Sequence, residues 1–146
     1  MKDEYMTYTY RYGIGTPLYV VNGGPGLECS YLKNFFMPLS DEREIVFYDQ
    51  IGTGRDFDMN IRISSDVFIR QLVQLLQNDN RRKDIVAHSW GTFLTISALM
   101  NPVVNESVDR IILINPFALD YRRYEESAAR LTKRYDGVHP NAALTT

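Results

Sequence analysis

The chain has 146 residues, with a hydrophobic content of 45%, a charged content of 23% and a formal net charge of −2 at pH 7. These values are typical of one ordinary globular domain, and the scattered basic residues give no sign of a nucleic-acid partner or an anionic membrane surface. Cys29 is the only cysteine, the segment after Met1 has no apolar core of a secretory signal, and no apolar run is long enough to span a bilayer. We therefore expect a cytoplasmic protein without a nucleic-acid or membrane partner.

The first half of the chain predicts three strands and one helix. Side chains alternate in character over residues 5–12, and short apolar runs at 18–21 and 44–48 complete the three strands. Residues 28–38 fit a helix. The side chains expected to face inward from this helix are Tyr31, Leu32, Phe35 and Phe36.

The second half continues with helices and strands in alternation. Ser64 or Ser65 is a suitable N-cap for a helix with an apolar face. The apolar residues at helical spacing are Phe68, Ile69, Leu72, Leu75 and Leu76. The elements expected next are a strand at 85–87, a helix at 92–100 that Asn101-Pro102 stops, a buried strand at 110–115 and a helix at 121–135. From Gly137 onward the sequence is polar, and we expect a loose tail.

Strands that alternate with helices predict an α/β fold with a mostly parallel sheet flanked by helices. The near-continuous apolar strands agree, because the strands of a parallel sheet are buried on both faces. In such sheets, ligands bind at the carboxyl ends of the strands. Three glycine-bearing segments follow strands at that end: 22–26, 52–54 and 89–91. We therefore expect them to converge on one site.

Residues 84–91 form a short apolar run that leads into a turn around Ser89. The pattern small-x-Ser-x-Gly between a strand and a helix is that of a nucleophile elbow, which exposes the serine hydroxyl. Ala87 and Gly91 are small enough to let the two backbones pass close together. Ser89 is therefore a candidate nucleophile, and a base must take its proton for it to react.

Three motifs in this order resemble the proline iminopeptidase branch of the α/β-hydrolases: N-G-G-P-G at 22–26, Y-D-Q-I-G-T-G-R at 48–55 and A-H-S-W-G-T at 87–92. The resemblance extends over residues 5–115. It implies an α/β-hydrolase-like fold and a serine hydrolase that acts on peptides or amides, often releasing an N-terminal residue such as proline. Four residues stand where the family has His, Arg, Ser and often Gly: Asn22, Ile51, Asp56 and Ala87. These departures alter the packing of loops near the site, so we do not carry over the substrate preference.

Carried over position by position, Ser89 resembles the nucleophile, and the backbone N–H groups of Gly24 and Trp90 resemble the two oxyanion-hole donors. The residue types agree, because a glycine lets the backbone approach a developing oxyanion and the residue after the nucleophile directs its N–H into the same space. The other residues expected to line the site are Asn22, Gly23, Pro25, Gly26 and His88. We expect no cofactor and no metal, since the sequence has no cluster of His and Cys.

The family fold continues past the length of this chain, through a helical cap, two more core strands, a catalytic Asp and a catalytic His. We therefore expect residues 1–116 to be the N-terminal part of the core, and residues 117–146 to be the start of the cap region and a loose tail. His88 precedes the nucleophile and is expected to be structural. The one alternative triad joins Ser89 to His139 and Asp120, but a loose tail seldom holds a base within hydrogen-bond reach.

Three functions stay open at this point. The first is a peptidase or aminopeptidase with a small peptide or amide substrate, incomplete in this chain. The second is a catalytically inactive, truncated domain that binds a partner or itself, because the sheet edge at residues 108–115 is left unpaired. The third is an esterase. Asp49 and Arg55 are expected to be structural residues that pin the loop bordering the site.

Overall fold

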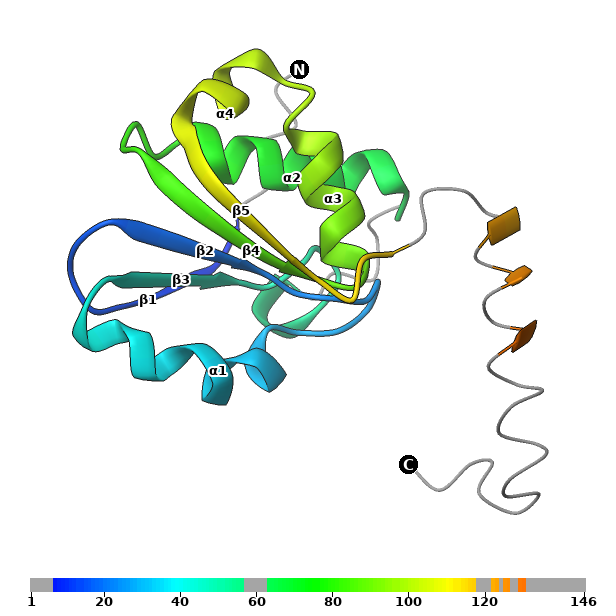
Figure 1. Ribbon diagram of the computed structural model, residues 1–146, viewed down its shortest axis with the longest axis horizontal. Coiled ribbons are helices and arrows are strands. Elements are labelled where there is room, and N and C mark those ends of the chain that lie inside the picture. Colours follow the sequence, from blue (N-terminus) through cyan, green and yellow to red (C-terminus); the bar gives the residue numbers. More distant parts are fainter. Residues whose placement is uncertain (1–6, 57–62, 118–121, 124, 127–128, 131–146) are drawn as a thin grey trace. The chain divides into compact units, whose positions relative to one another are not determined.

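The computed structural model describes residues 7–56 and 63–117, together with 122, 123, 125, 126, 129 and 130. The chain divides into two compact units, Met1–Pro116 and Phe117–Thr146. The first unit holds a five-stranded sheet in the order β1-β3-β2-β4-β5 (Figure 1). In the second unit the described residues 122, 123, 125, 126, 129 and 130 are helical and exposed, within the helix predicted at 121–135, and the predicted tail lies outside the described residues.

The sheet is mostly parallel, as predicted. Its strands are β1 (Thr9–Tyr12), β2 (Pro17–Val21), β3 (Glu44–Tyr48), β4 (Lys83–His88) and β5 (Val108–Ile114). β1 pairs antiparallel with β3, whereas the pairs β2 with β3, β2 with β4 and β4 with β5 are parallel. β1 begins four residues later than predicted, since Thr7 and Tyr8 are not in the strand and residues 5 and 6 lie outside the described part of the chain.

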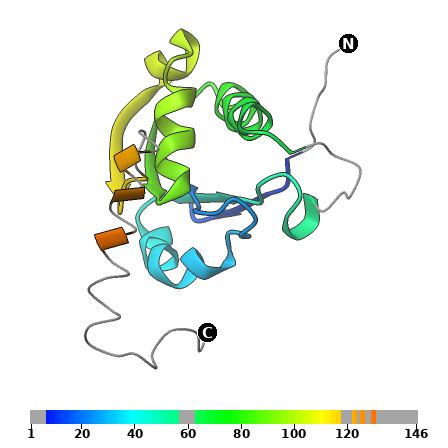
Figure 2. The ribbon, with the colours of Figure 1, turned by 90° about the vertical axis from the view of Figure 1, so that its right-hand side faces the viewer.

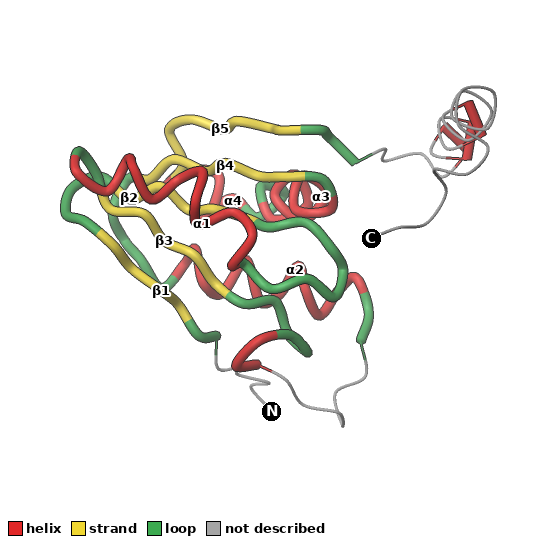
Figure 3. The backbone as a smooth tube through the Cα atoms, turned by 90° about the horizontal axis from the view of Figure 1, so that it is seen from below, coloured by secondary structure: helices red, strands yellow, loops and turns green. Residues whose placement is uncertain are grey.

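Helices cover both faces of this sheet. They are α1 (Ser30–Phe36), the short 3-10 helices η1 (Met37–Asp41) and η2 (Gly54–Asp56), α2 (Ser65–Gln77), α3 (Trp90–Ala98) and α4 (Pro102–Ser107). Figure 2 shows α1 on one side of the sheet and α2 and α3 on the other, and Figure 3 shows β1 and β5 at opposite edges. The helices that follow β2 and β4 begin at the carboxyl ends of their strands, which brings the glycine-bearing loops to one end of the sheet.

The central strand β2 contributes to two hydrophobic cores, and all five of its residues are buried. Leu18 and Val20 pack on the side of α1 with Leu32, whereas Tyr19 and Val21 pack on the side of α2 and α3. Successive side chains of a strand point to opposite faces, so a strand covered on both sides is apolar at nearly every position. The core residues from the long helix include Phe68, Leu72, Leu75 and Leu76, which confirms its predicted apolar face.

α1 is shorter than predicted and buries fewer aromatic side chains. Leu32 is buried and Phe36 packs against the core, but Phe35 is 74% exposed and Tyr31 is 37% exposed. The prediction that all four side chains face inward is therefore wrong for Tyr31 and Phe35. Residues four apart share one stripe of a helix, so Leu32 and Phe36 face the sheet together. Tyr31 and Phe35 lie one step around the helix and stay at its rim.

Two helix starts follow capping signals in the sequence. Ser64 is the N-cap of α2, as predicted, although its side chain makes no capping hydrogen bond. α3 ends at Ala98, two residues before the predicted end at Met100. Asn101 begins the next helix, because its Oδ1 accepts hydrogen bonds from the N–H groups of Val103 (3.1 Å) and Val104 (3.4 Å). Asn followed by Pro is an N-cap signal with Pro at the first helical position, so α4 was visible in the sequence but not predicted.

β5 was predicted to be a buried strand, and this is wrong, whereas the sheet edge expected at residues 108–115 is confirmed. It is the edge strand of the sheet, and the four apolar residues Ile111, Ile112, Leu113 and Ile114 are 43%, 57%, 38% and 37% exposed. Its composition matches that of a strand covered on both sides, but burial depends on neighbouring elements that composition does not supply. Among the residues that the structure describes, no helix is both long and apolar enough to cross a bilayer.

Candidate active site

Ser89 lies at the turn between β4 and α3, with φ 50° and ψ −120°. A non-glycine residue in this region is strained by about 1–3 kcal/mol, and such strain persists only where the surrounding structure enforces it. Two sets of hydrogen bonds do so. The N–H of Ser89 donates to the carbonyl of Ile114 (3.0 Å), and the carbonyl of Ser89 accepts from the N–H (2.9 Å) and Oγ1 (2.6 Å) of Thr92. The turn that carries Ser89 is therefore held between β5 and the first turn of α3.

The tight fit behind the turn requires glycine at position 91. A Cβ placed on Gly91 would lie 2.4 Å from the carbonyl oxygen of Val21 and 2.6 Å from that of Asn22. Both atoms belong to the backbone and cannot move aside without shifting β2. Ala87, two residues before Ser89, is fully buried in β4. The small residues of the motif therefore let α3 start directly against the end of β2.

The glycine-rich loop after β2 lies beside Ser89. A Cβ placed on Gly23 would be 3.3 Å from the Cβ of Ser89, 3.2 Å from Nδ1 of His88 and 2.9 Å from the hydroxyl of Tyr31. The expected convergence of the loops is thus seen for segment 22–26 and the elbow. Pro25 and Gly26 are exposed, whereas Asn22 and Gly23 are buried.

The peptide between Gly23 and Gly24 is held from its buried side. The carbonyl of Gly23 accepts hydrogen bonds from Nδ2 of Asn22 (3.1 Å) and Nε2 of Gln50 (3.4 Å), and both side chains are fully buried. This peptide is trans, so its N–H points away from its carbonyl oxygen. No described residue accepts a hydrogen bond from the N–H of Gly24. That N–H is therefore directed away from the buried amides, as an anion-binding donor must be.

Gln50 is a residue of the site that the sequence analysis missed. Its Nε2 also donates to the carbonyl of Asn22 (2.8 Å), and Nδ2 of Asn22 donates to the carbonyl of Leu27 (2.7 Å). The two side-chain amides thus bind three carbonyls of one loop. The available signal was the position of Gln50, a polar residue that directly follows a buried strand at the carboxyl end of the sheet.

Trp90 is the first residue of α3, so its backbone N–H lies at the positive end of the helix. Its ring packs edge-on against Phe68, with ring centroids 6.3 Å apart, and tilted against Phe93 at 4.8 Å. These contacts hold the Trp90 ring, at the start of α3, against α2 and against the next turn of α3. The N–H groups of Gly24 and Trp90 thus come from the two loops that meet at Ser89.

No base is placed against the Ser89 hydroxyl in the described part of the chain. Ser89 Oγ makes no hydrogen bond to another described residue, and Nδ1 of His88 lies 2.8 Å from the hydroxyl of Tyr31 instead. The alternative acid and base, Asp120 and His139, lie outside the described residues. The same described ranges contain no group of three or more His, Cys, Asp or Glu placed to hold a metal ion.

Asp49 ties together the loops that border the site. Its carboxylate accepts hydrogen bonds from the hydroxyl of Tyr10 (2.7 Å) and the N–H groups of Arg55 (3.3 Å) and Cys29 (3.4 Å). Burial acts to raise the pKa of Asp49, but the hydrogen bonds from Tyr10, Arg55 and Cys29 outweigh it and hold the pKa below its ordinary value. The hydrogen bond between Tyr10 and Asp49 is also the largest cause that raises the pKa of Tyr10 to about 12. Asp49 is therefore an ionised structural anchor.

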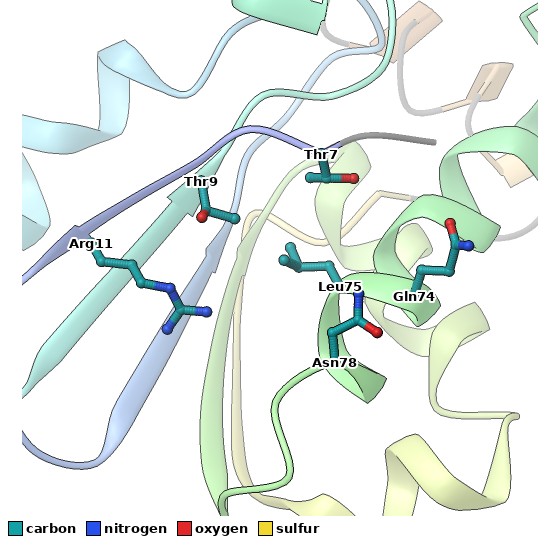
Figure 4. A pocket seen from close by; sticks show the side chains of 6 residues that line it. All are labelled: Thr7, Thr9, Arg11, Gln74, Leu75 and Asn78. Atoms are coloured by element: carbon teal, nitrogen blue, oxygen red, sulfur yellow. The ribbon is translucent and has the colours of Figure 1, made fainter. Parts of the chain in front are cut away.

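Two cavities differ in their relation to Ser89. An apolar one of about 580 Å³ lies between α1 and the elbow, and its lining includes Phe35, His88 and Ile114. A polar one of about 220 Å³ lies between β1 and α2 and shares no residue with the elbow (Figure 4). Arg11, which lines the polar cavity, already donates to Glu44 and Tyr19. The apolar cavity is the one next to the candidate site.

Comparison with known proteins finds homologues that match most of this chain and part of their own length. A proline iminopeptidase from Heyndrickxia coagulans is 33% identical over 125 residues, which cover 84% of this chain and 42% of that protein. This chain is a homologue of the proline iminopeptidases. The crystal structure of proline iminopeptidase from Mycobacterium smegmatis matches 88% of the chain and 46% of its own, with a TM-score of 0.71 and 23% identity. A thermophilic esterase from Thermogutta terrifontis matches 92% of the chain and 50% of its own, with a TM-score of 0.68 and 19% identity.

These matches confirm the predicted resemblance and the α/β-hydrolase fold. No protein-family model matches the chain. The chain spans 42% of the length of its Heyndrickxia relative and 46% of the Mycobacterium structure. This proline iminopeptidase homologue therefore has the α/β-hydrolase fold and corresponds to less than half of each of these relatives.

Proposed function

We propose that this chain carries the nucleophile and the oxyanion hole of a serine hydrolase that releases the N-terminal residue of a small peptide or amide. Two findings support the proposal. The homologue from Heyndrickxia is a proline iminopeptidase, and Ser89 is held in a strained turn beside the glycine loop. The strained turn is the observation that carries the role of Ser89, because strain of this kind gathers at functional sites.

In the proposed reaction, Ser89 Oγ attacks the carbonyl carbon of the scissile amide while its proton passes to a base. The N–H groups of Gly24 and Trp90 stabilise the oxyanion, and one such donor is worth about 3 kcal/mol. The proton then moves to the amine as the C–N bond breaks, and water hydrolyses the acyl-enzyme. The base and its acid are not among the described residues, so we expect this chain alone to turn over substrate weakly or not at all.

The test is labelling of the purified chain by a fluorophosphonate. The parent is compared with Ser89→Ala and with the control Ser97→Ala, which lies in the helix that follows Ser89. We expect slow labelling of the parent and the control and none of Ser89→Ala. A parent that stays unlabelled, or a Ser89→Ala variant that is labelled like the parent, contradicts the nucleophile. Rapid turnover of proline 4-nitroanilide that Ser89→Ala abolishes would keep the nucleophile but contradict the expectation of weak turnover.

An esterase uses the same nucleophile and oxyanion hole, and the structural match to the Thermogutta esterase keeps this variant open. Esters and amides differ in their leaving groups, because the alcohol of an ester leaves with less help from a general acid than the amine of an amide. Parallel assays with an aryl ester and an amide of the same acyl group decide between them. Activity on the ester alone would favour the esterase.

As a second candidate, we propose that the chain acts as a non-catalytic module that pairs with a copy of itself through β5. The four exposed apolar residues of this edge strand favour it, since an open edge recruits another strand. We expect sedimentation equilibrium to show a dimer that Ile112→Lys dissociates. The control is Ile14→Lys, at a 92% exposed position outside the strands. A monomer at high concentration contradicts this candidate. The cytoplasmic location stays a prediction.

A further inference from the structure

Tyr31 joins three segments that meet at the candidate site. Its hydroxyl accepts a hydrogen bond from the N–H of Gly23 (2.7 Å) and lies 2.8 Å from Nδ1 of His88. The two rings are also packed edge to face, with centroids 5.7 Å apart at 63°. Tyr31 lies in the first turn of α1, Gly23 in the loop after β2, and His88 directly before Ser89. One side chain therefore links α1, the glycine loop and the elbow.

The hydroxyl of Tyr31 can bind Gly23 and His88 at the same time. A phenol hydroxyl has one proton to donate and can accept with its lone pairs. Because Gly23 already donates to the oxygen, the proton of Tyr31 is available for Nδ1 of His88. Burial raises the pKa of Tyr31, although the bond from Gly23 opposes this, so the hydroxyl keeps its proton at neutral pH. It can therefore donate to Nδ1 of His88 in one tautomer of the ring and accept from Nδ1 in the other, so the contact links the two residues in either case.

The same contact decides which amide of the loop can act on an oxyanion. The N–H of Gly23 is occupied by Tyr31, and the carbonyl of Gly23 is occupied by Asn22 and Gln50. Both peptides that flank Gly23 are thus fixed in orientation. The next N–H along, that of Gly24, is the one left directed away from the buried amides.

We propose that Tyr31 is a positioning residue that couples the glycine loop to the nucleophile elbow through Gly23 and His88. The proposal deepens the function proposed above, on which its meaning for catalysis rests. Packing alone does not explain the residue, since Tyr31 is 37% exposed and its hydroxyl is the atom that reaches both partners. Because Tyr31 holds the loop before the reaction, the N–H donor of Gly24 need not be reorganised when the oxyanion forms.

The experiment replaces the hydroxyl and leaves the ring, in Tyr31→Phe. Tyr12→Phe is the matched control, because Tyr12 lies in β1 and no described hydrogen bond involves its hydroxyl. Amide hydrogen exchange of Gly23 and the imidazole ¹⁵N signals of His88 are measured by NMR in the resting chain. We expect exchange of Gly23 to become about fivefold faster in Tyr31→Phe, the effect of one lost hydrogen bond, and to stay unchanged in the control.

The ¹⁵N signals report more than packing. In Tyr31→Phe we expect the Nδ1 signal of His88 to shift from its position in the parent, because the substitution removes the hydrogen-bond partner of that atom. Unchanged Gly23 exchange and unchanged His88 signals in Tyr31→Phe overturn the proposal. Neither measurement needs turnover, so they stand even if fluorophosphonate labelling shows Ser89 to be inert.

Coupling between the two partners is tested by a double-mutant cycle on the labelling rate. His88→Phe removes the acceptor and keeps an aromatic ring. If Tyr31 acts through His88, each single variant lowers the rate and Tyr31→Phe combined with His88→Phe lowers it no further. If the double variant is labelled at a rate reduced by the product of the two single effects, the coupling is overturned. A parent that is never labelled contradicts the proposed function instead.

Discussion

Gly91 lies against the main-chain carbonyl of Val21, so closely that a Cβ on Gly91 would be 2.4 Å from that oxygen. This contact fixes how near α3 can approach β2, and with it the separation of Ser89 from the glycine loop. Glycine is needed here for space rather than for backbone freedom, because Gly91 is not among the positive-φ residues.

The substitution Gly91→Ala should therefore cost about 1–3 kcal/mol of unfolding free energy, the usual penalty of overpacking against rigid neighbours. Urea denaturation measures it. Gly26→Ala is the comparison, since a Cβ there meets nothing within 4 Å and only its φ of +93° opposes a side chain. A Gly91→Ala variant as stable as the parent would show that the elbow relaxes freely.

The strain at Ser89 predicts that a residue without Cβ is better tolerated there than alanine. Ser89→Gly should be more stable than Ser89→Ala by about 1 kcal/mol, because glycine adopts positive φ without a steric cost and alanine does not. Thermal denaturation of the two variants checks this. Both lose the hydroxyl, so the difference isolates the backbone. Equal stabilities would mean that the turn carries no strain.

Asp49 predicts a pH dependence of stability. Its folded-state pKa lies below the ordinary value of about 3.9, so its ionised form adds stability above that pH. The contribution is lost as pH falls through the lowered pKa. Asp49→Asn should cost about 2 kcal/mol at pH 7, and the difference from the parent should shrink below pH 4.

Unfolding curves at a series of pH values measure this difference. The control is Asp41→Asn, at an exposed carboxylate without a described hydrogen bond, and its curve should follow the parent. A cost for Asp49→Asn that grows on acidification would reverse the sign and contradict the role given to the Tyr10, Arg55 and Cys29 donors.

The burial of Cys29 beside Asp49 predicts that its thiol is unreactive. Burial is the largest cause that raises its pKa to about 12, followed by the charge of Asp49, and the residue is 2% exposed. The thiolate is the reactive form, so at pH 8 the folded chain should hold on the order of a thousandfold less of it than a free cysteine. Titration with a disulfide reagent should be slow in buffer and rapid in urea. Rapid modification of the folded chain would contradict this.

Local patterns made part of this structure predictable. The order of strands and helices, the apolar face of α2 and the turn at Ser89 all follow from periodicity and residue size, which a short window of sequence contains. The role of Gln50 and the contact of Tyr31 with Gly23 do not. Tyr31 and Gly23 are eight residues apart in the chain, and only the path of the loop between β2 and α1 brings the hydroxyl to the amide.

The sequence by itself determined the alternation of strands and helices and the position of the strained serine, because both depend on the preferences of neighbouring residues for one backbone conformation. The tertiary structure decided which apolar strands are covered and which groups of the glycine loop are held by side chains. Burial and hydrogen-bond partnership belong to pairs of segments, so β5, apolar along most of its length, is exposed because no described strand pairs with its outer edge.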